Sequence, residues 1–456
     1  MKLLKPRQTY RRKKPRCSVM AALLAAALLT GCTPPNEAPP ASEQDAAPLP
    51  TQTPAEPAAT GFVTLTREDA SLWGCGGDQG FYEIRYDEAT GNKILYVDYQ
   101  TAREIYLCAD PNCTHDQENC TAWLDPDEGG YLPLVSGEHL LLVHITYGAE
   151  APERAIPHIE AANLDGSDRH TLVEFAANER LSRTFAANGS QLICALNEVS
   201  SDGQQGIGAT FKLVSIDLDT GARTDFYTCP VQLNGTEPAF LGVTENGCCV
   251  LRQKIQTKSE ADFPGQDWAD IHEEIERSAQ YTCTVVPVGS SQPVGTVTYS
   301  GRVYDLLTEA GLFYLDLDTR TLTRITLPNG LATELSTLPD VGATSFWLDG
   351  QMGDWFLLSQ GQSQQNEAGT SWRVTDSCYA VQVQTGERRE LTIRQQSGAD
   401  LLLCTMLGKN AADVLLVTGN HATPGAGPQQ AEWSLINQQA YLDSDADALR
   451  PVQLLP

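Results

Sequence analysis

The sequence predicts an all-β fold, a β-propeller with seven blades, and repeated hairpins are the main reason. In Leu213–Thr228 an apolar strand runs into Asp-Leu-Asp, turns at Thr220-Gly221 and is followed by a second strand. Alternating side chains around a glycine turn are typical of a β-hairpin. A hairpin cannot bury its apolar face alone, so recurrence of the pattern indicates units that stack on one another. Related segments occur at Ile94–Leu107, Ile159–Val173, Gly311–Leu327 and Tyr379–Ile393.

The hairpins divide the chain after residue 60 into candidate blades. The segment 301–328 is one strand short, so six or eight blades are open alternatives. A solenoid also repeats, but the irregular spacing of the hairpins favours blades. We expect Pro451–Leu455 to close the ring beside the first blade, which removes exposed sheet edges. The expected blades are 72–107, 131–175, 182–229, 237–299, 301–328, 342–393 and 399–455.

One insertion in the fourth candidate blade has helical periodicity. In Ser259–Gln280 the apolar residues Trp268, Ile271 and Ile275 recur at i, i+3 and i+7. This spacing is typical of a short amphipathic helix. We expect the helix to project from one rim and to pack on its own blade. A lip over the central channel or a contact with a partner is the functional alternative.

The first 31 residues predict a secretory signal peptide. They carry eight Lys and Arg residues and no acid, and the apolar run Val19–Leu29 is too short to span a bilayer. The run ends in Leu29-Thr30-Gly31-Cys32, which resembles the lipobox of bacterial lipoproteins. That resemblance implies cleavage before Cys32 and lipidation of Cys32. Cleavage at a nearby small-residue site, with Cys32 incidental, is the alternative.

Residues 32–60 predict a tether that begins at the lipidated Cys32. Pro, Ala, Glu, Gln and Thr dominate this stretch, so it cannot bury enough apolar surface to fold. The propeller domain is therefore expected to be 61–456. Loss of the eight positive charges of the signal takes the net charge from −27 to −35. Such a surface repels phosphate backbones, which argues against nucleic acid as a partner.

Enzyme signatures are mostly missing from the sequence. It has no phosphate-binding G-x-x-x-x-G-K-[ST] loop and no G-x-S-x-G elbow. The helix segment beginning at His272 has Glu276 where a zinc-binding H-E-x-x-H motif needs its second histidine. The Asp-rich turns could bind Ca²⁺ through oxygen ligands, but such residues more often cap their own turns, as we expect here. The residues concerned are Asp217, Asp219, Asp316 and Asp318.

A short cysteine-rich loop is the exception. Three cysteines and one histidine fall within thirteen residues after the first expected blade, in the spacing C-x4-C-x-H-x4-C. This is a ligand set that tetrahedral Zn²⁺ accepts, and four protein ligands leave no open position for water. We therefore predict a structural zinc site. The expected ligands are Cys108, Cys113, His115 and Cys120.

Two other interpretations of this loop stay open. A Cys108–Cys120 disulfide would stabilise the fold by roughly 3 kcal/mol in the chain-entropy model, with Cys113 unpaired or bonded to Cys75. Alternatively, His115 is a surface residue of a polar loop. Cysteines in apolar strands, such as Cys194 and Cys404, are expected to be small buried hydrophobic residues.

The lipobox, the Pro-rich tether and the cysteine loop together resemble uncharacterised, lipid-anchored propeller lipoproteins of Gram-positive anaerobic bacteria. The matching loop residues are Leu107, Cys108, Pro111, Cys113, His115 and Cys120. The resemblance covers the N-terminal third of the chain and, beyond it, only the repeat character. It implies a propeller on the extracytoplasmic face of the cell membrane. It implies no activity.

These observations predict a non-catalytic binding or scaffolding lipoprotein, acting as a monomer on a solute, glycan or polypeptide. The alternative is a propeller hydrolase or lyase that acts on envelope polymers or glycans, because propellers host both classes. We assign no catalytic residue. Carboxylates or a His/carboxylate cluster converging at the channel mouth would favour an enzyme, whereas an aromatic or plain polar lining would favour binding.

Overall fold

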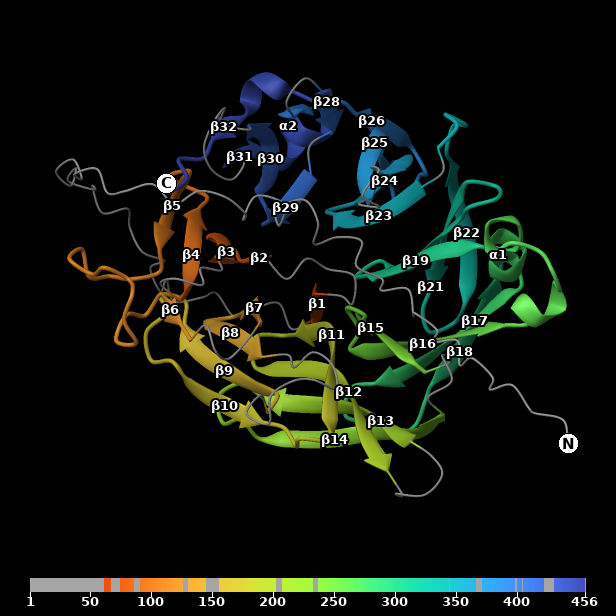
Figure 1. The fold of residues 1–456 in the computed structure, drawn as a ribbon, viewed down its shortest axis with the longest axis horizontal. Coiled ribbons are helices and arrows are strands. Elements are labelled where there is room, and N and C mark those ends of the chain that lie inside the picture. The colour runs from red at the N-terminus through yellow and green to blue at the C-terminus, as the bar shows by residue number, and fades with distance from the viewer. Residues whose placement is uncertain are drawn as a thin grey trace, which may run out of the picture.

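Apolar strand residues build seven mainly antiparallel sheets, which surround a common axis in the computed structural model (Figure 1). The fold is thus a seven-bladed β-propeller, as predicted. The structure describes residues 61–66, 74–85, 91–125, 130–144, 156–201, 207–232, 237–343, 345–365, 371–397, 400–403, 405–421 and 430–455. The expected signal peptide, Cys32, the tether and Cys404 lie outside the described residues.

The first three blades each contain four antiparallel strands, counted from the ring axis outward. A two-residue strand, β6 (Trp123–Leu124), adds to β4 in blade 1. The bounds are β2 (Gly74–Gly76), β3 (Gly80–Arg85), β4 (Asn92–Asp98) and β5 (Arg103–Tyr106); β7 (Tyr131–Ser136), β8 (His139–His144), β9 (His158–Asn163) and β10 (His170–Glu174); and β11 (Glu179–Ala187), β12 (Gln191–Ser201), β13 (Ile207–Asp217) and β14 (Arg223–Gln232).

The remaining blades follow the same order. Blade 7 is the irregular one, because β27 (Arg394–Ser397) runs parallel to the end of β30 and pairs with β28 (Asp400–Leu403). The other bounds are β15 (Ala239–Val243), β16 (Cys248–Gln256), β17 (Ala279–Pro287) and β18 (Gly295–Ser300); β19 (Val303–Thr308), β20 (Gly311–Asp316), β21 (Thr321–Thr326) and β22 (Leu331–Thr337); β23 (Ser345–Met352), β24 (Trp355–Gln365), β25 (Ser371–Gln382) and β26 (Arg388–Leu391); and β29 (Thr405–Lys409), β30 (Asp413–His421), β31 (Gln430–Asn437) and β32 (Arg450–Pro451).

The core lies between neighbouring blades. Successive side chains of a strand point to opposite faces of its sheet, so each blade needs an apolar neighbour on both sides. In β13, Val214 packs with Leu141 of blade 2, whereas the preceding Leu213 packs with Leu251 of blade 4. Leu213 and Val214 are both completely buried. The strand pattern therefore determines the stacking of blades.

The predicted hairpins are correct as hairpins, but one holds a different place in its blade. Four of the five join the third and fourth strands, whereas Gly311–Leu327 joins the second and third strands, β20 and β21. Blade 5 therefore extends beyond the expected bound of 328, and β22 supplies its fourth strand. Most of β22 is exposed, so its sequence lacks the apolar alternation by which a strand is recognised.

The turn prediction is confirmed at two aspartates. The Asp217 carboxylate accepts hydrogen bonds from the backbone N–H and the hydroxyl of Thr220, and Asp316 accepts the N–H groups of its own turn. Gly221 then takes a φ of +69°, a region that favours glycine. Asp219 and Asp318 have other roles. Asp219 pairs with a histidine of blade 2, and Asp318 pairs with the helical insertion.

The insertion contains the predicted helix, α1 (Trp268–Arg277), preceded by the 3-10 turn η3 (Glu260–Asp262). Ile271 and Ile275 are each 3% exposed, as expected for an apolar stripe on the blade. Trp268 is 56% exposed, so the prediction that it belongs to this stripe is wrong. It is the first residue of the helix, and its side chain turns toward the η3 segment instead of the blade.

A second helix, α2 (Gln438–Leu442), lies outside the predicted insertion. Its N-terminus is capped by Asn437, whose side chain accepts the Gln439 N–H at 2.9 Å. Five residues are too few for a helical period to be visible in sequence. Within the part of the chain that the structure describes, neither helix has the length and apolarity needed to cross a membrane.

The two ends of the described chain complete the ring. After β32, Gln453 forms a parallel bridge with Arg103 of blade 1, donating its N–H to Ala102 O and accepting the Glu104 N–H, both at 2.9 Å. This confirms the expected closure by Pro451–Leu455. Strand β1 (Val63–Thr66) pairs with β11 on the axial side of blade 3 and lies near the ring centre (Figure 1).

An acidic pair lies at the closing seam, the buried Glu104 and the partly exposed Glu83. Glu104 is 3% exposed, and its carboxylate accepts hydrogen bonds from Arg85 Nη2 at 3.0 Å and from the Leu455 N–H at 2.7 Å. Burial, and then the nearby Glu104 charge, raise the pKa of Glu83 to about 8, against the lowering effect of Arg85. Glu83 therefore holds its proton to a higher pH than an ordinary glutamate does.

We predict that Glu83 makes the fold less stable as the pH rises. The pKa of Glu83 in the folded state exceeds the ordinary value of 4.5. The free energy of unfolding therefore has its full value below pH 4.5, where Glu83 is protonated in both states, and falls progressively up to about pH 8. Over this pH range the free energy of unfolding falls by an amount on the order of 4 kcal/mol. Glu83→Gln should remove much of this slope when urea unfolding is measured between pH 5 and 9. Glu387→Gln, on an exposed turn, is the control, and equal slopes for wild type and Glu83→Gln would refute the assignment.

Candidate metal centre

The cysteine loop begins and ends on blade 1. Its first residue, Leu107, is completely buried and donates its N–H to Ile94 O at 3.0 Å. The chain then makes two tight turns, in which the Cys113 N–H bonds to Asp110 O at 3.1 Å and the Cys120 N–H bonds to Gln117 O at 2.9 Å. These turns fold the loop back on itself. The next residues reach β6, which returns the chain to β4.

The structure brings all four predicted ligands together. One ligand atom from each of Cys108, Cys113, His115 and Cys120 can be chosen so that all lie within 4.8 Å of one another. A tetrahedron with metal–sulfur bonds of about 2.3 Å has edges of about 3.8 Å. The observed spacing is therefore close to that of a four-coordinate site, and the group could hold a metal ion.

His115 is held in position by its backbone and by an aromatic neighbour. Its φ is +58°, and its N–H contacts the Cys113 sulfur at 3.4 Å. The Tyr106 ring stacks on the imidazole, with ring centres 4.2 Å apart and planes inclined by 25°. Nδ1 of His115 lies 3.3 Å from the Cys120 sulfur, so Nδ1 is the nitrogen that faces the group. Sequence reasoning missed Tyr106, although an aromatic residue two positions before Cys108 was a visible signal.

The electrostatics of the site favour the neutral forms of Cys120 and His115. Burial, together with hydrogen bonds that the Cys120 thiol makes to Cys113 and Cys108, raises the pKa of Cys120 to about 12. Burial, and then the positive charge of Lys93, lower the pKa of His115. A neutral imidazole is the form that binds metals, whereas the thiol must lose its proton when an ion enters. Metal binding here is thus coupled to proton release.

The three cysteines of the loop are free thiols in the structure. None of the ten cysteines that the structure describes forms a disulfide. Cys75 lies on β2, outside the metal group, and burial raises its pKa. Cys194 is completely buried in a strand, as predicted.

Three other histidines that the structure describes have contacts outside the group. His139 lies 3.6 Å from Asp219, while His158 and His170 each contact a backbone carbonyl two residues earlier. Glu276, where the zinc-binding helix motif would need histidine, pairs with Lys254 at 2.6 Å. Among the described residues, the cysteine loop is the one group of three or more Cys, His, Asp or Glu side chains with this spacing.

The loop also packs on blade 2. A Cβ on Gly166 would lie 3.1 Å from the Leu107 side chain, so the two segments are in close contact. The Tyr82 hydroxyl donates to Leu164 O at 3.1 Å, and Arg169 Nη1 donates to Trp123 O at 2.8 Å. The candidate metal group therefore lies at the junction between blades 1 and 2.

Comparisons with known proteins found distant similarity to solved structures alone. No protein-family model and no curated protein matches the chain. Among solved structures, a puromycin hydrolase mutant (S511A) in complex with PGG is similar at 13% identity and a TM-score of 0.47, over 88% of this chain and 56% of that one. An acylaminoacyl peptidase of Pyrococcus horikoshii is 11% identical, with a TM-score of 0.39, over 70% and 51% of the two chains. The propeller domain of the trilobed protease of Pyrococcus furiosus is 10% identical, with a TM-score of 0.39, over 70% and 83%. The chain spans about half the length of the first two.

Proposed function

We propose that the chain is a lipid-anchored lipoprotein on the extracytoplasmic face of the cell membrane, and that its propeller binds a partner without catalysing a reaction. The lipobox-like segment ending at Cys32 and the Pro-rich stretch after it support anchoring. The net charge of −27 supports a cationic or neutral partner over nucleic acid.

The position of Gly61 is the observation that carries this proposal. Gly61, where the tether would join the propeller, lies against Glu245 in the turn before β16. The insertion with α1 follows the other end of the same strand. Nine residues of β-strand span about 27 Å, so the two features are on opposite faces of the ring. A tether on one face leaves the face with α1 available to a partner.

We further propose that Cys108, Cys113, His115 and Cys120 bind a structural Zn²⁺ ion. Three sulfur ligands and one nitrogen ligand suit zinc, and a group filled by four protein ligands has no coordination position for substrate or water. The contacts of the loop with blade 2 give the ion a physical role, because it would fix the loop that fastens blade 1 to its neighbour.

The zinc proposal predicts about one zinc per chain when the protein is purified without chelator. His115→Ala, and alanine at each of the three cysteines, should lower zinc content at least tenfold, measured by elemental analysis together with thiol counting. Cys229→Ala is the matched control, because Cys229 is half-buried in a strand outside the group. A Cys108–Cys120 or Cys75–Cys113 disulfide, found by mass spectrometry in anaerobically prepared protein, would refute the proposal.

The anchor predicts that Cys32→Ala releases the protein from membranes. Stable anchoring of this kind depends on the acyl chains, so the variant should appear in the soluble fraction after a high-salt wash. Cys17→Ala, in the expected signal, should fractionate as wild type does. Retention of Cys32→Ala on washed membranes would show that lipidation is not what holds the protein there.

A ligand screen separates binding from the hydrolase or lyase alternative. We expect envelope glycans or basic polypeptides to raise the melting temperature of the full chain, because a ligand that binds only the folded state stabilises it. The same samples are analysed for cleavage products. Product release that exceeds that of heat-inactivated protein would establish an enzyme, and stabilisation without products is the result that we expect.

A further inference from the structure

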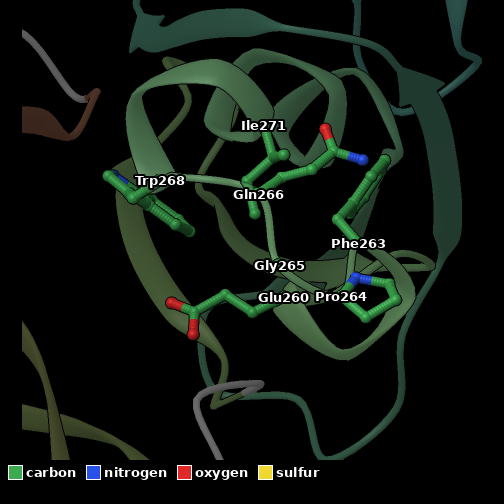
Figure 2. A pocket seen from close by; sticks show the side chains of 7 residues that line it. All are labelled: Glu260, Phe263, Pro264, Gly265, Gln266, Trp268 and Ile271. Atoms are coloured by element: carbon green, nitrogen blue, oxygen red, sulfur yellow. The ribbon is translucent and has the colours of Figure 1, made fainter.

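The helical insertion forms a pocket that faces solvent. Figure 2 shows the pocket, with Trp268 on one side and Phe263 and Pro264 on the other. Its volume is about 280 Å³. Pockets for drug-sized ligands are usually larger, at about 300–1,000 Å³, so this pocket has room for about one side chain.

The walls of the pocket are fastened to the propeller. Arg277 of α1 pairs with Asp318 of blade 5 at 2.8 Å, and Glu273 pairs with Arg302 at 3.1 Å. The buried Ile271 and Ile275 hold the helix against its blade. The pocket is therefore formed before any ligand arrives, which lowers the entropic cost of binding.

The pocket has one charged lining residue, and that residue is acidic. Glu260 makes no ion pair among the described residues, and its carboxylate lies on the same side as the Trp268 ring (Figure 2). Lys258, close in sequence, is already paired with Glu274. Asp262 accepts hydrogen bonds from Ser259 at the start of η3. Lys258 Nζ lies 5.9 Å from the centre of the Phe263 ring, so a cation borders that wall, while Glu260 is the one charged residue in the lining itself.

We propose that this pocket binds an arginine side chain of a basic polypeptide. An indole face attracts a cation, and a planar guanidinium can stack on it while donating two hydrogen bonds to a carboxylate. Trp268 supplies the exposed ring and Glu260 supplies the carboxylate. The acidic surface of the chain adds long-range attraction for a basic partner. This inference rests on the proposed binding function and names its partner class.

The test is a titration of the full chain in mild detergent, labelled with ¹⁵N at tryptophan. The probe is acetyl-Gly-Arg-Gly-amide, and its matched control carries citrulline, which has nearly the same shape and no charge. The chain has seven tryptophans, and the indole signal of Trp268 is the one that disappears in Trp268→Phe. We expect the arginine peptide to shift this signal with millimolar affinity, at least about fivefold more tightly than the citrulline peptide.

Two charge variants locate the interaction. Glu260→Gln should weaken arginine binding about fivefold, whereas Glu245→Gln, which removes an equal charge on the tether face, should leave it unchanged. Equal affinity for arginine and citrulline, or no effect of Glu260→Gln, would overturn the proposal. A larger shift of the Trp268 signal with a chitin trisaccharide than with arginine would identify a glycan site instead.

The outcome is separable from that of the proposed function. If Cys32→Ala fractionation supports anchoring and the arginine peptide does not bind, the pocket assignment alone is wrong. If the peptide binds and anchoring fails, the location is wrong and the arginine site remains.

Discussion

Closure of the ring between blades 1 and 7 is the constraint on which the other packing depends. Each blade has two apolar faces, so the first and last blades are covered only if the chain ends meet. Phe81 and Val97 of blade 1 pack with Leu415 and Leu435 of blade 7. The bridge from Gln453 to β5 joins the two sheets beside this cluster. A change in the protonation of Glu83 therefore acts close to the seam that closes the ring.

Blade 1 has additional contacts at both of its seams, the Glu104 interactions on one side and the cysteine loop on the other. The short strands of this blade explain the need for them. β2 has three residues, β5 has four and β6 has two, so blade 1 has a short hydrogen-bonded ladder. The seam with blade 7 is reinforced by the buried Glu104 interactions, and the seam with blade 2 by the cysteine loop. An ion held by the loop would compensate for contacts that short strands cannot make.

The sequence predicts those parts of the fold in which local pattern and burial coincide. In Leu213–Thr228 the first strand is apolar because side chains on both of its faces are buried, and the Thr220-Gly221 turn marks its end. β22 was not predicted because most of its side chains are exposed. β1 was not predicted because its place at the ring axis depends on a contact between Thr64 and Val243, which are far apart in sequence and meet only in the folded chain. The four metal ligands were predictable because they are close in sequence. The exposure of Trp268 was not, because the helical spacing does not show that the blade covers Ile271 and Ile275 but not the first residue of the helix.

The position of β1 also makes the centre of the ring a less favourable place for a binding site. β1 takes the axial edge of blade 3 and contacts blades 2 and 4, so part of the inner surface is covered by the chain itself. The insertion differs, since its ion pairs to blade 5 hold it in place while Trp268 stays exposed. A partner that covers the Trp268 ring would remove apolar surface from water, which contributes to binding and is the physical reason to look for it at this rim.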